Sequence, residues 1–286
     1  MTGIFRPDLL ENRHALITGG GSGLGLAMAR RFRELGARVT ICGRSRERLD
    51  EAAKRLEAEE GEPVFRLAVD VRDPDEVRDA MDRIRKEAGS LDAVVNNAAG
   101  NFLAPTEELS PNGFDAVVRT VLHGTFHVSA EAARSWIQAE RPGNILNILT
   151  TYAWTGSAFV IPSAAAKAGV LAMTRSLAVE WAEYGIRVNG MAPGAFPTEG
   201  AWERLLPTEE MEEEARSRVP LGRFGDVSEL ADMAAYLISD GSGYMTGECV
   251  TLDGGAWLAS GGLFNRLTRQ PREEVKEFLE SLKPKR

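Results

Sequence analysis

The sequence has few of the residues that build disulfide frameworks, metal centres or membrane spans. It holds 2 cysteines and 3 histidines among 286 residues, and no apolar run approaches the roughly 20 residues needed to cross a bilayer. Cys42 and Cys249 lie in apolar, strand-like runs, which predicts buried thiols in a reducing compartment rather than a disulfide. His14, His123 and His127 show no ligand spacing with a cysteine, so we expect no metal site.

Basic residues are outnumbered by acidic ones, 34 to 42. A formal net charge of −8 argues against general nucleic-acid binding, although local arginines can still bind anionic ligands. The first residues lack the apolar stretch of a secretory signal peptide, and the final KPKR is neither a peroxisomal nor an endoplasmic-reticulum retention signal. We therefore expect a cytoplasmic protein without membrane insertion.

The sequence does contain a regular alternation of apolar, β-rich runs with helical periodicity. Such alternation gives parallel strands joined by right-handed helical crossovers. It predicts an α/β fold: one Rossmann-type, doubly wound parallel sheet of seven strands with helices on both faces. The predicted strands span residues 13–18, 37–42, 63–70, 91–97, 144–150, 186–192 and 247–253.

One domain is expected to cover residues 1–286, because there are no internal repeats and no low-complexity linker. Residues 195–225 interrupt the alternation after the sixth strand, at a position where such folds carry a lid over the carboxyl edge of the sheet. Residues 259–286 are expected to form a helical tail, with an amphipathic helix over 271–282.

A glycine-rich turn joins the first strand to the first helix. Glycines there allow a sharp turn and a close approach to a pyrophosphate, which the free N–H groups of the helix N-terminus then bind. No Lys-Ser/Thr pair closes the turn, so a nucleoside-triphosphate P-loop is not indicated. The residues predicted to bind a cofactor here are Gly19, Gly21, Ser22, Gly23, Leu24 and Gly25.

The end of the second strand indicates which nucleotide binds. It reads Cys42-Gly43-Arg44-Ser45-Arg46, with no acidic residue to accept an adenosine 2′-hydroxyl. Arg44 can stack on adenine or bind a 2′-phosphate, which favours NADPH/NADP over NAD. Arg46 and Arg48 fit better as solvated surface residues.

The stretch from Thr150 to Lys167 holds the candidate catalytic side chains. Pro162 suits the first position of a helix, and Ser163 and Lys167 then share one helix face, four residues apart. Tyr152 stands eleven residues before Ser163. A hydroxyl and an ammonium on this face can hold a sugar hydroxyl or a polarised oxygen.

Four motifs together resemble the short-chain dehydrogenase/reductase family over residues 10–258. They are the GxxxGxG spacing, Asp70 after the third strand, the run from Asn97 to Gly100 after the fourth, and Pro193-Gly194 after the sixth. The resemblance implies hydride transfer with a nicotinamide cofactor by a homo-oligomer, commonly a homotetramer. It implies cofactor contacts at Asp70, Val71, Asn97, Ala98, Gly100, Lys167, Pro193, Gly194 and Phe196.

Three positions depart from the usual family pattern. Ser163 stands at the tyrosine of Tyr-x-x-x-Lys, Thr150 at the usual serine, and Val121 at the helix asparagine. An alcohol dehydrogenase needs that tyrosine to take the hydroxyl proton, so ordinary carbonyl reduction is not expected.

These departures make the chain similar to NADPH-dependent 2,4-dienoyl-CoA reductases of the mitochondrial type. The runs 96–102, 150–152 and 162–167, and the segments 198–205 and 260–265, carry the likeness. It implies catalytic roles for Tyr152, Asn101, Lys167 and Ser163. It implies contacts to an acyl-CoA substrate by Arg44, Arg72, Phe102, Ser110 and Arg204.

The implied reaction converts 2,4-dienoyl-CoA to trans-3-enoyl-CoA in the β-oxidation of unsaturated fatty acids. Hydride arriving at the far carbon leaves a dienolate at the thioester oxygen, which needs hydrogen-bond donors rather than an alcohol-proton base. A tyrosine hydroxyl and an asparagine amide are both donors, and Lys167 adds positive charge.

Alternative interpretations remain for several of these residues and for the function. Tyr152 could be a packing aromatic, Asn101 a turn residue, and Arg72 and Arg204 surface charges. The protein could instead be a trans-2-enoyl-CoA reductase or another short-chain oxidoreductase. A non-catalytic NADP-sensing protein is the alternative of another class.

Overall fold

The computed structural model describes residues 4–198 and 208–283. Within these residues, seven parallel strands form one sheet in the order β3-β2-β1-β4-β5-β6-β7. The order in which successive strands are added to the sheet reverses between β1 and β4, and such folds bind their ligands at this point. The predicted fold class is therefore confirmed. The strands are β1 (His14–Thr18), β2 (Arg38–Gly43), β3 (Phe65–Ala68), β4 (Ala93–Asn96), β5 (Gly143–Ile148), β6 (Ile186–Pro193) and β7 (Cys249–Leu252).

Each predicted strand is present, although some are shorter than the apolar run that predicted them. The run 63–70 forms a strand only over Phe65–Ala68. Its pairing nevertheless continues, because the Val69 N–H donates to the Gly43 carbonyl at 2.9 Å. Apolar residues beyond a strand end thus still pack beneath the loops that form the site.

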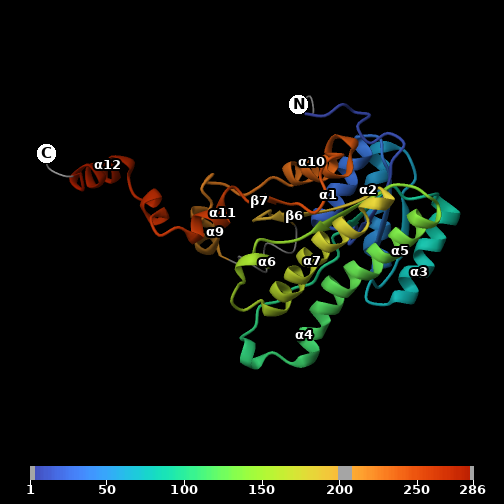
Figure 1. The fold of residues 1–286 in the computed structure, drawn as a ribbon, viewed down its shortest axis with the longest axis horizontal. Helices are drawn as coiled ribbons and strands as arrows, with labels where there is room; N and C mark the ends of the chain where they lie inside the picture. Colours follow the sequence, from blue (N-terminus) through green and yellow to red (C-terminus); the bar gives the residue numbers. More distant parts are fainter. Residues whose placement is uncertain (1–3, 199–207, 284–286) are drawn as a thin grey trace.

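Helices cover both faces of the sheet (Figure 1). Successive strand residues point to opposite faces, so in β1 the side chain of Ile17 packs against α1, α2 and α10, while that of Leu16 packs against α3, α5 and α7. The helices are α1 (Gly23–Glu34), α2 (Arg46–Glu60), α3 (Pro74–Arg83), α4 (Pro111–Val118), α5 (Gly124–Gln138), α6 (Tyr152–Thr155), α7 (Ile161–Glu180), α9 (Glu209–Ser217), α10 (Val227–Ile238), α11 (Ala256–Gly261) and α12 (Arg272–Ser281).

Two features of the helices have no signal in the predicted strand pattern. A wide π-helical turn over Arg119–His123 separates α4 from α5. The segment after β5 contains the single-turn helix α6. π turns often occur at functional sites, and both features lie at the carboxyl edge of the sheet.

The segment predicted as a lid is described in part. Residues 199–207 lie outside the described residues, and the rest includes α9, whose first turn is capped by Thr208. The predicted tail contains α11, a 3₁₀ helix over Asn265–Arg269, and α12, which stands apart from the sheet in Figure 1.

Two expected absences can be examined over residues 4–198 and 208–283. No helix in these ranges is both long and apolar enough to cross a membrane. No group of histidine, cysteine and acidic side chains there has the geometry to hold a metal ion. Cys42 and Cys249 are both free thiols, and burial raises the pKa of Cys42 to about 12.

Candidate active site

The glycine turn after β1 is packed so closely that two of its glycines leave little room for a side chain. Gly19 has a φ of +67°, a left-handed conformation that favours glycine. A Cβ on Gly25 would lie 2.4 Å from the Gly19 carbonyl oxygen and 2.6 Å from the Asn97 side chain. The turn therefore holds the N-terminus of α1 against the end of β4, with its N–H groups facing the cleft.

Thr18 and Asn97 join the ends of β1 and β4. The Thr18 hydroxyl accepts the N–H of Asn97 at 3.0 Å and that of Ala98 at 2.9 Å. The Asn97 side-chain amide donates back to the Thr18 carbonyl at 3.0 Å. These contacts fix the backbone of the segment that leads to Asn101.

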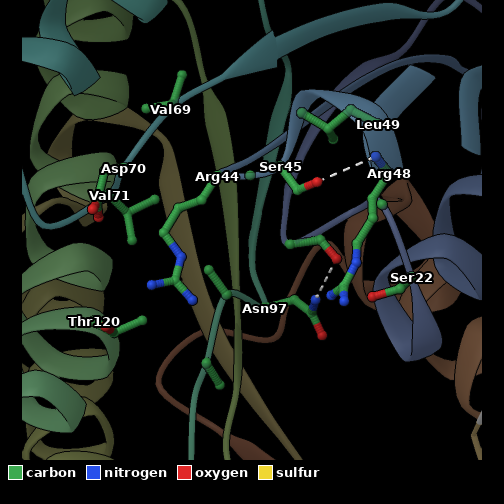
Figure 2. Close-up of a pocket in the computed structure, with 15 residues that line it drawn as sticks. Ser22, Arg44, Ser45, Arg48, Leu49, Val69, Asp70, Val71, Asn97 and Thr120 are labelled. Atoms are coloured by element: carbon green, nitrogen blue, oxygen red, sulfur yellow. Dashed lines mark hydrogen bonds between the residues drawn. The ribbon is translucent and has the colours of Figure 1, made fainter. Parts of the chain in front are cut away.

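A cavity of about 300 Å³ opens beside the hydrogen bonds between Thr18 and Asn97, which we call the Thr18–Asn97 brace. It collects residues from the ends of four strands, β1 to β4, and from the π turn (Figure 2). Of the predicted cofactor residues, those that line it are Gly19, Gly21, Ser22, Arg44, Asp70, Val71, Asn97 and Ala98. Gly43, Ser45, Arg48, Leu49, Val69, Ala99 and Thr120 complete the lining.

Arg44, between β2 and α2, and Arg48, in the first turn of α2, both line this cavity (Figure 2). Across the described part of the chain, neither guanidinium has a carboxylate partner within ion-pair distance. The sequence indicated Arg44 but treated Arg48 as a solvated residue. Ser45 caps α2 by accepting the Arg48 N–H at 3.3 Å. Ser45 is a recognisable helix N-cap in the sequence. It places Arg48 in the first turn of α2, and this was the signal that could have indicated Arg48 as a cavity residue.

Asp70 and Arg72 form a close ion pair on the adenosine side of the cavity. The Arg72 Nε lies 2.9 Å from each carboxylate oxygen of Asp70. The hydrogen bond from Arg72 lowers the pKa of Asp70, so the carboxylate stays ionised at neutral pH. Arg72, predicted to contact substrate, thus lies beside the predicted adenine-binding residue and does not line the cavity itself.

Tyr152 and Ser163 are brought together at the end of β5. The Tyr152 hydroxyl lies 2.9 Å from the Ser163 Oγ, and Ser163 is 2% exposed. Helix α6 begins at Tyr152 and turns its ring toward the first turn of α7. Sequence reasoning could pair these residues by type, but their contact depends on α6, which it did not predict.

Lys167 follows Ser163 by one turn of α7 and is buried. Its ammonium donates to the Ile148 carbonyl, at the end of β5. Burial lowers the pKa of Lys167 to about 8. Val121 and Val170 belong to one apolar cluster beneath this end of β5, so a valine occupies the helix position where the family usually has a polar asparagine.

Thr150 has a buried hydroxyl without a hydrogen-bond partner among the described residues. It occupies the position of the usual family serine, directly after β5. Buried hydroxyls rarely stay unpaired, so this group is available to a bound molecule.

The segment after β4 carries the other predicted catalytic residue. The Asn101 side-chain oxygen accepts the Phe102 N–H at 3.0 Å, which leaves the amide N–H₂ free to donate. Phe102 is 43% exposed. Ser110, predicted to contact substrate, caps α4 by accepting the Gly113 N–H at 3.1 Å. Arg204 lies outside the described residues.

The remaining predicted cofactor residues do not line this cavity. Gly23, Leu24 and Gly25 lie in the first turn of α1, and Gly100 precedes Asn101. Pro193 ends β6 and is followed by Gly194. Phe196 packs toward Gly225, where an added Cβ would meet its ring at 2.2 Å, so this side chain supports the base of the segment after β6.

Known proteins match this chain over most of its length. The family model described as enoyl-(acyl carrier protein) reductase matches residues 19–256. A Bacillus subtilis protein named probable 2,4-dienoyl-CoA reductase ((2E)-enoyl-CoA-producing) is 48% identical, covering 87% of this chain and 98% of its own. The Danio rerio peroxisomal 2,4-dienoyl-CoA reductase ((3E)-enoyl-CoA-producing) is 39% identical, covering 93% and 88%.

Solved structures agree with the sequence matches. A short-chain dehydrogenase from Bacillus anthracis is 44% identical with a TM-score of 0.78, covering 86% of this chain and 96% of its own. A Burkholderia cenocepacia gluconate 5-dehydrogenase, solved with NADP and tartrate, is 34% identical with a TM-score of 0.82, covering 88% and 98%. With the glycine turn, the Thr18–Asn97 brace and Lys167 in place, this chain belongs to the short-chain dehydrogenase/reductase family.

Proposed function

We propose that this protein is an NADPH-dependent oxidoreductase that converts 2,4-dienoyl-CoA to trans-3-enoyl-CoA. The observation that carries the proposal is the Tyr152–Ser163 hydroxyl pair, at 2.9 Å, in place of the family's usual tyrosine on α7. A tyrosine relocated to α6 suits a substrate oxygen that must be stabilised as an enolate. The names of the matched relatives support the same substrate class.

The cavity residues fit a dinucleotide with a 2′-phosphate. The glycine turn leaves no room for a Cβ at Gly25, and its N–H groups suit a pyrophosphate. Arg44 and Arg48 provide two cations without carboxylate partners in the described structure, and Ser45 adds a hydroxyl. These groups would hold the 2′-phosphate, while Asp70 would bind the adenine. When bound, NADPH supplies the hydride.

The protein's part in the chemistry is to stabilise negative charge on the thioester oxygen. The Tyr152 hydroxyl would donate to that oxygen while it accepts a hydrogen bond from Ser163. The Asn101 amide, oriented by its bond to the Phe102 N–H, would provide a second donor. Removal of one such donor costs catalysis about 10²–10³-fold in other enzymes.

Protonation then determines the product. With hydride added at C5, a proton placed on C2 leaves a 3-enoyl thioester, whereas a proton placed on C4 leaves a 2-enoyl thioester. We propose protonation at C2 by water, because C2 is the carbon of the dienolate next to C1, which bears the stabilised oxygen. Lys167 would bind the cofactor ribose and add positive charge beside the site. The two relatives carry names for different products, so the product is part of the test.

Turnover with three substrates tests the function. NADPH oxidation is followed with 2,4-decadienoyl-CoA, trans-2-decenoyl-CoA and a simple ketone, and the first product is identified by proton NMR in deuterated water. We expect turnover of the dienoyl thioester alone, with deuterium at C2 and a double bond at C3. Turnover of the enoyl thioester would favour the alternative reductase. Tight NADPH binding with no turnover would favour an NADP-sensing protein.

We further propose a homotetramer in the cytoplasm. Exposed apolar side chains on the surfaces of α5 and α7 support self-association, since Phe126 is 51% exposed and Val179 81% exposed. Light scattering after size exclusion should give four times the 31.1 kDa chain mass. A monomer mass would reject the tetramer.

A further inference from the structure

Two tryptophans from segments far apart in the sequence meet close to Tyr152. Trp154 lies in α6, two residues after Tyr152, and Trp257 is the second residue of α11. Their ring centroids are 5.6 Å apart with planes at 79°, an edge-to-face contact. The contact joins the turn that carries Tyr152 to the segment after β7, 103 residues away in sequence. Figure 1 shows α6 and α11 at the same end of the sheet.

The position of Trp257 is fixed by a hydrogen bond from its backbone N–H to Asp253. The Asp253 carboxylate accepts the Gly255 N–H at 2.9 Å and the Trp257 N–H at 2.8 Å, which sets the start of α11. Asp253 in turn packs on Gly194, where an added Cβ would lie 2.6 Å from the Asp253 Cβ. Trp257 is therefore anchored directly beside the end of β6, where Pro193 and Gly194 flank the proposed nicotinamide site.

The tryptophan pair lies at the surface and is not part of the buried core. Trp154 is 36% exposed, and Trp257 is half-buried. Phe159, in the loop between α6 and α7, is 59% exposed and has a φ of +64°. A left-handed conformation is costly for an aromatic residue and often marks a functional constraint.

Phe159 also connects this surface to the other catalytic segment. Its carbonyl accepts the Ala104 N–H at 3.0 Å, so the loop after α6 lies against the loop after β4. That loop presents the exposed ring of Phe102 next to Asn101. Apolar side chains thus flank both predicted oxyanion donors along the chain, since Trp154 follows Tyr152 by two residues and Phe102 follows Asn101 directly. Such surfaces suit a hydrocarbon chain that extends from the thioester.

We propose that the Trp154–Trp257 pair forms a wall of the acyl-chain subsite and sets the preference for chain length. The proposal rests on the proposed function, because it assigns the hydrocarbon part of that substrate to these two rings. Edge-to-face packing fixes both rings, so methylenes beyond C5 of the substrate would lie against a rigid surface.

The test compares chain lengths in Trp257→Ala, Trp257→Phe and Trp154→Ala, with Trp181→Phe as a control at the end of α7. The ratio of kcat/KM for 2,4-decadienoyl-CoA to that for 2,4-hexadienoyl-CoA should fall about tenfold in the two alanine variants. Trp257→Phe should retain most of the ratio, and kcat with the six-carbon substrate should change little. If Trp257→Ala does not fold, Trp257→Leu removes the aromatic contact while keeping apolar volume.

A binding experiment distinguishes the failure of this inference from the failure of the proposed function. Saturated decanoyl-CoA and hexanoyl-CoA cannot be reduced, and their binding to the NADP-loaded protein is followed by tryptophan fluorescence. The wild-type protein should bind the longer thioester more tightly and lose that advantage on Trp257→Ala, even if no dienoyl-CoA is turned over. Equal losses for both chain lengths, or no change in either ratio, would overturn the proposal.

Discussion

The hydroxyl groups of Tyr152 and Ser163 lie 2.9 Å apart, one from the single-turn helix α6 and the other from the first turn of α7. Ser163 is buried and can donate to Tyr152, which leaves the Tyr152 proton free for a substrate oxygen. Under the proposed function, the tyrosine is shifted from the helix position that serves alcohol oxidation to one that would stabilise an enolate.

Replacement of Tyr152 by phenylalanine should lower kcat with 2,4-decadienoyl-CoA about 10²–10³-fold, because one oxyanion donor is lost. The NADPH dissociation constant should not change. Ser163→Ala should have a smaller effect, since the serine acts through the tyrosine. Tyr184→Phe is the matched control, because Tyr184 lies at the surface after α7. Near-normal turnover by Tyr152→Phe would reject the assigned role.

Lys167 should destabilise the protein without cofactor at neutral pH. Its pKa falls from 10.5 to about 8 on folding because burial disfavours the charged form. The folded state therefore binds fewer protons than the unfolded state between these values, and stability rises with pH across that window. Below pH 8 the full cost of about 3 kcal/mol applies.

The variant Lys167→Met isolates this effect. It should raise the free energy of unfolding by about 3 kcal/mol below pH 8, and the gain should vanish toward the unfolded pKa of 10.5. Activity should be lost. Urea denaturation at several pH values measures the difference, and Lys54→Met, at an exposed position of α2, provides the control. A gain that is constant with pH would contradict the assignment.

Arg44 and Arg48 should both select NADPH over NADH. Replacing either with alanine should raise KM for NADPH about 10–100-fold, the range for a lost hydrogen bond to a charged group, and change KM for NADH little. Arg46→Ala is the control, because the Arg46 side chain is 87% exposed and pairs only loosely with Asp50, at 3.9 Å. Equal effects on both cofactors would show that Arg48 does not contact the 2′-phosphate.

Gly25→Ala should weaken both folding and cofactor binding. The added Cβ would lie 2.4 Å from the Gly19 carbonyl oxygen, so the turn must move. Overpacking of this kind costs about 1–3 kcal/mol. Gly261→Ala adds a Cβ with no described atom within 4 Å and should leave stability nearly unchanged. Thermal unfolding with and without NADPH separates the two effects.

The strands and the end of β1 could be predicted from sequence because their signals are local. Residues 15–18 are continuously apolar or β-branched, and the glycines that follow allow a sharp turn. Contacts between distant segments carry no such signal. Arg48 enters the cofactor cavity only because Ser45 starts α2 at a particular residue. The Trp154–Trp257 contact requires β5 and β7 to end at the same edge, with β6 between them.

The Thr18–Asn97 brace bears on the order in which the cofactor and the thioester bind. The Thr18 hydroxyl, one residue before the phosphate-binding turn, accepts the N–H groups of Asn97 and Ala98, which begin the segment that leads to Asn101. Under the proposed function, we expect a bound nucleotide to order the segment that carries the Asn101 amide. We expect obligatory ordered association, cofactor first, with NADP competitive against NADPH and noncompetitive against the thioester in product-inhibition plots.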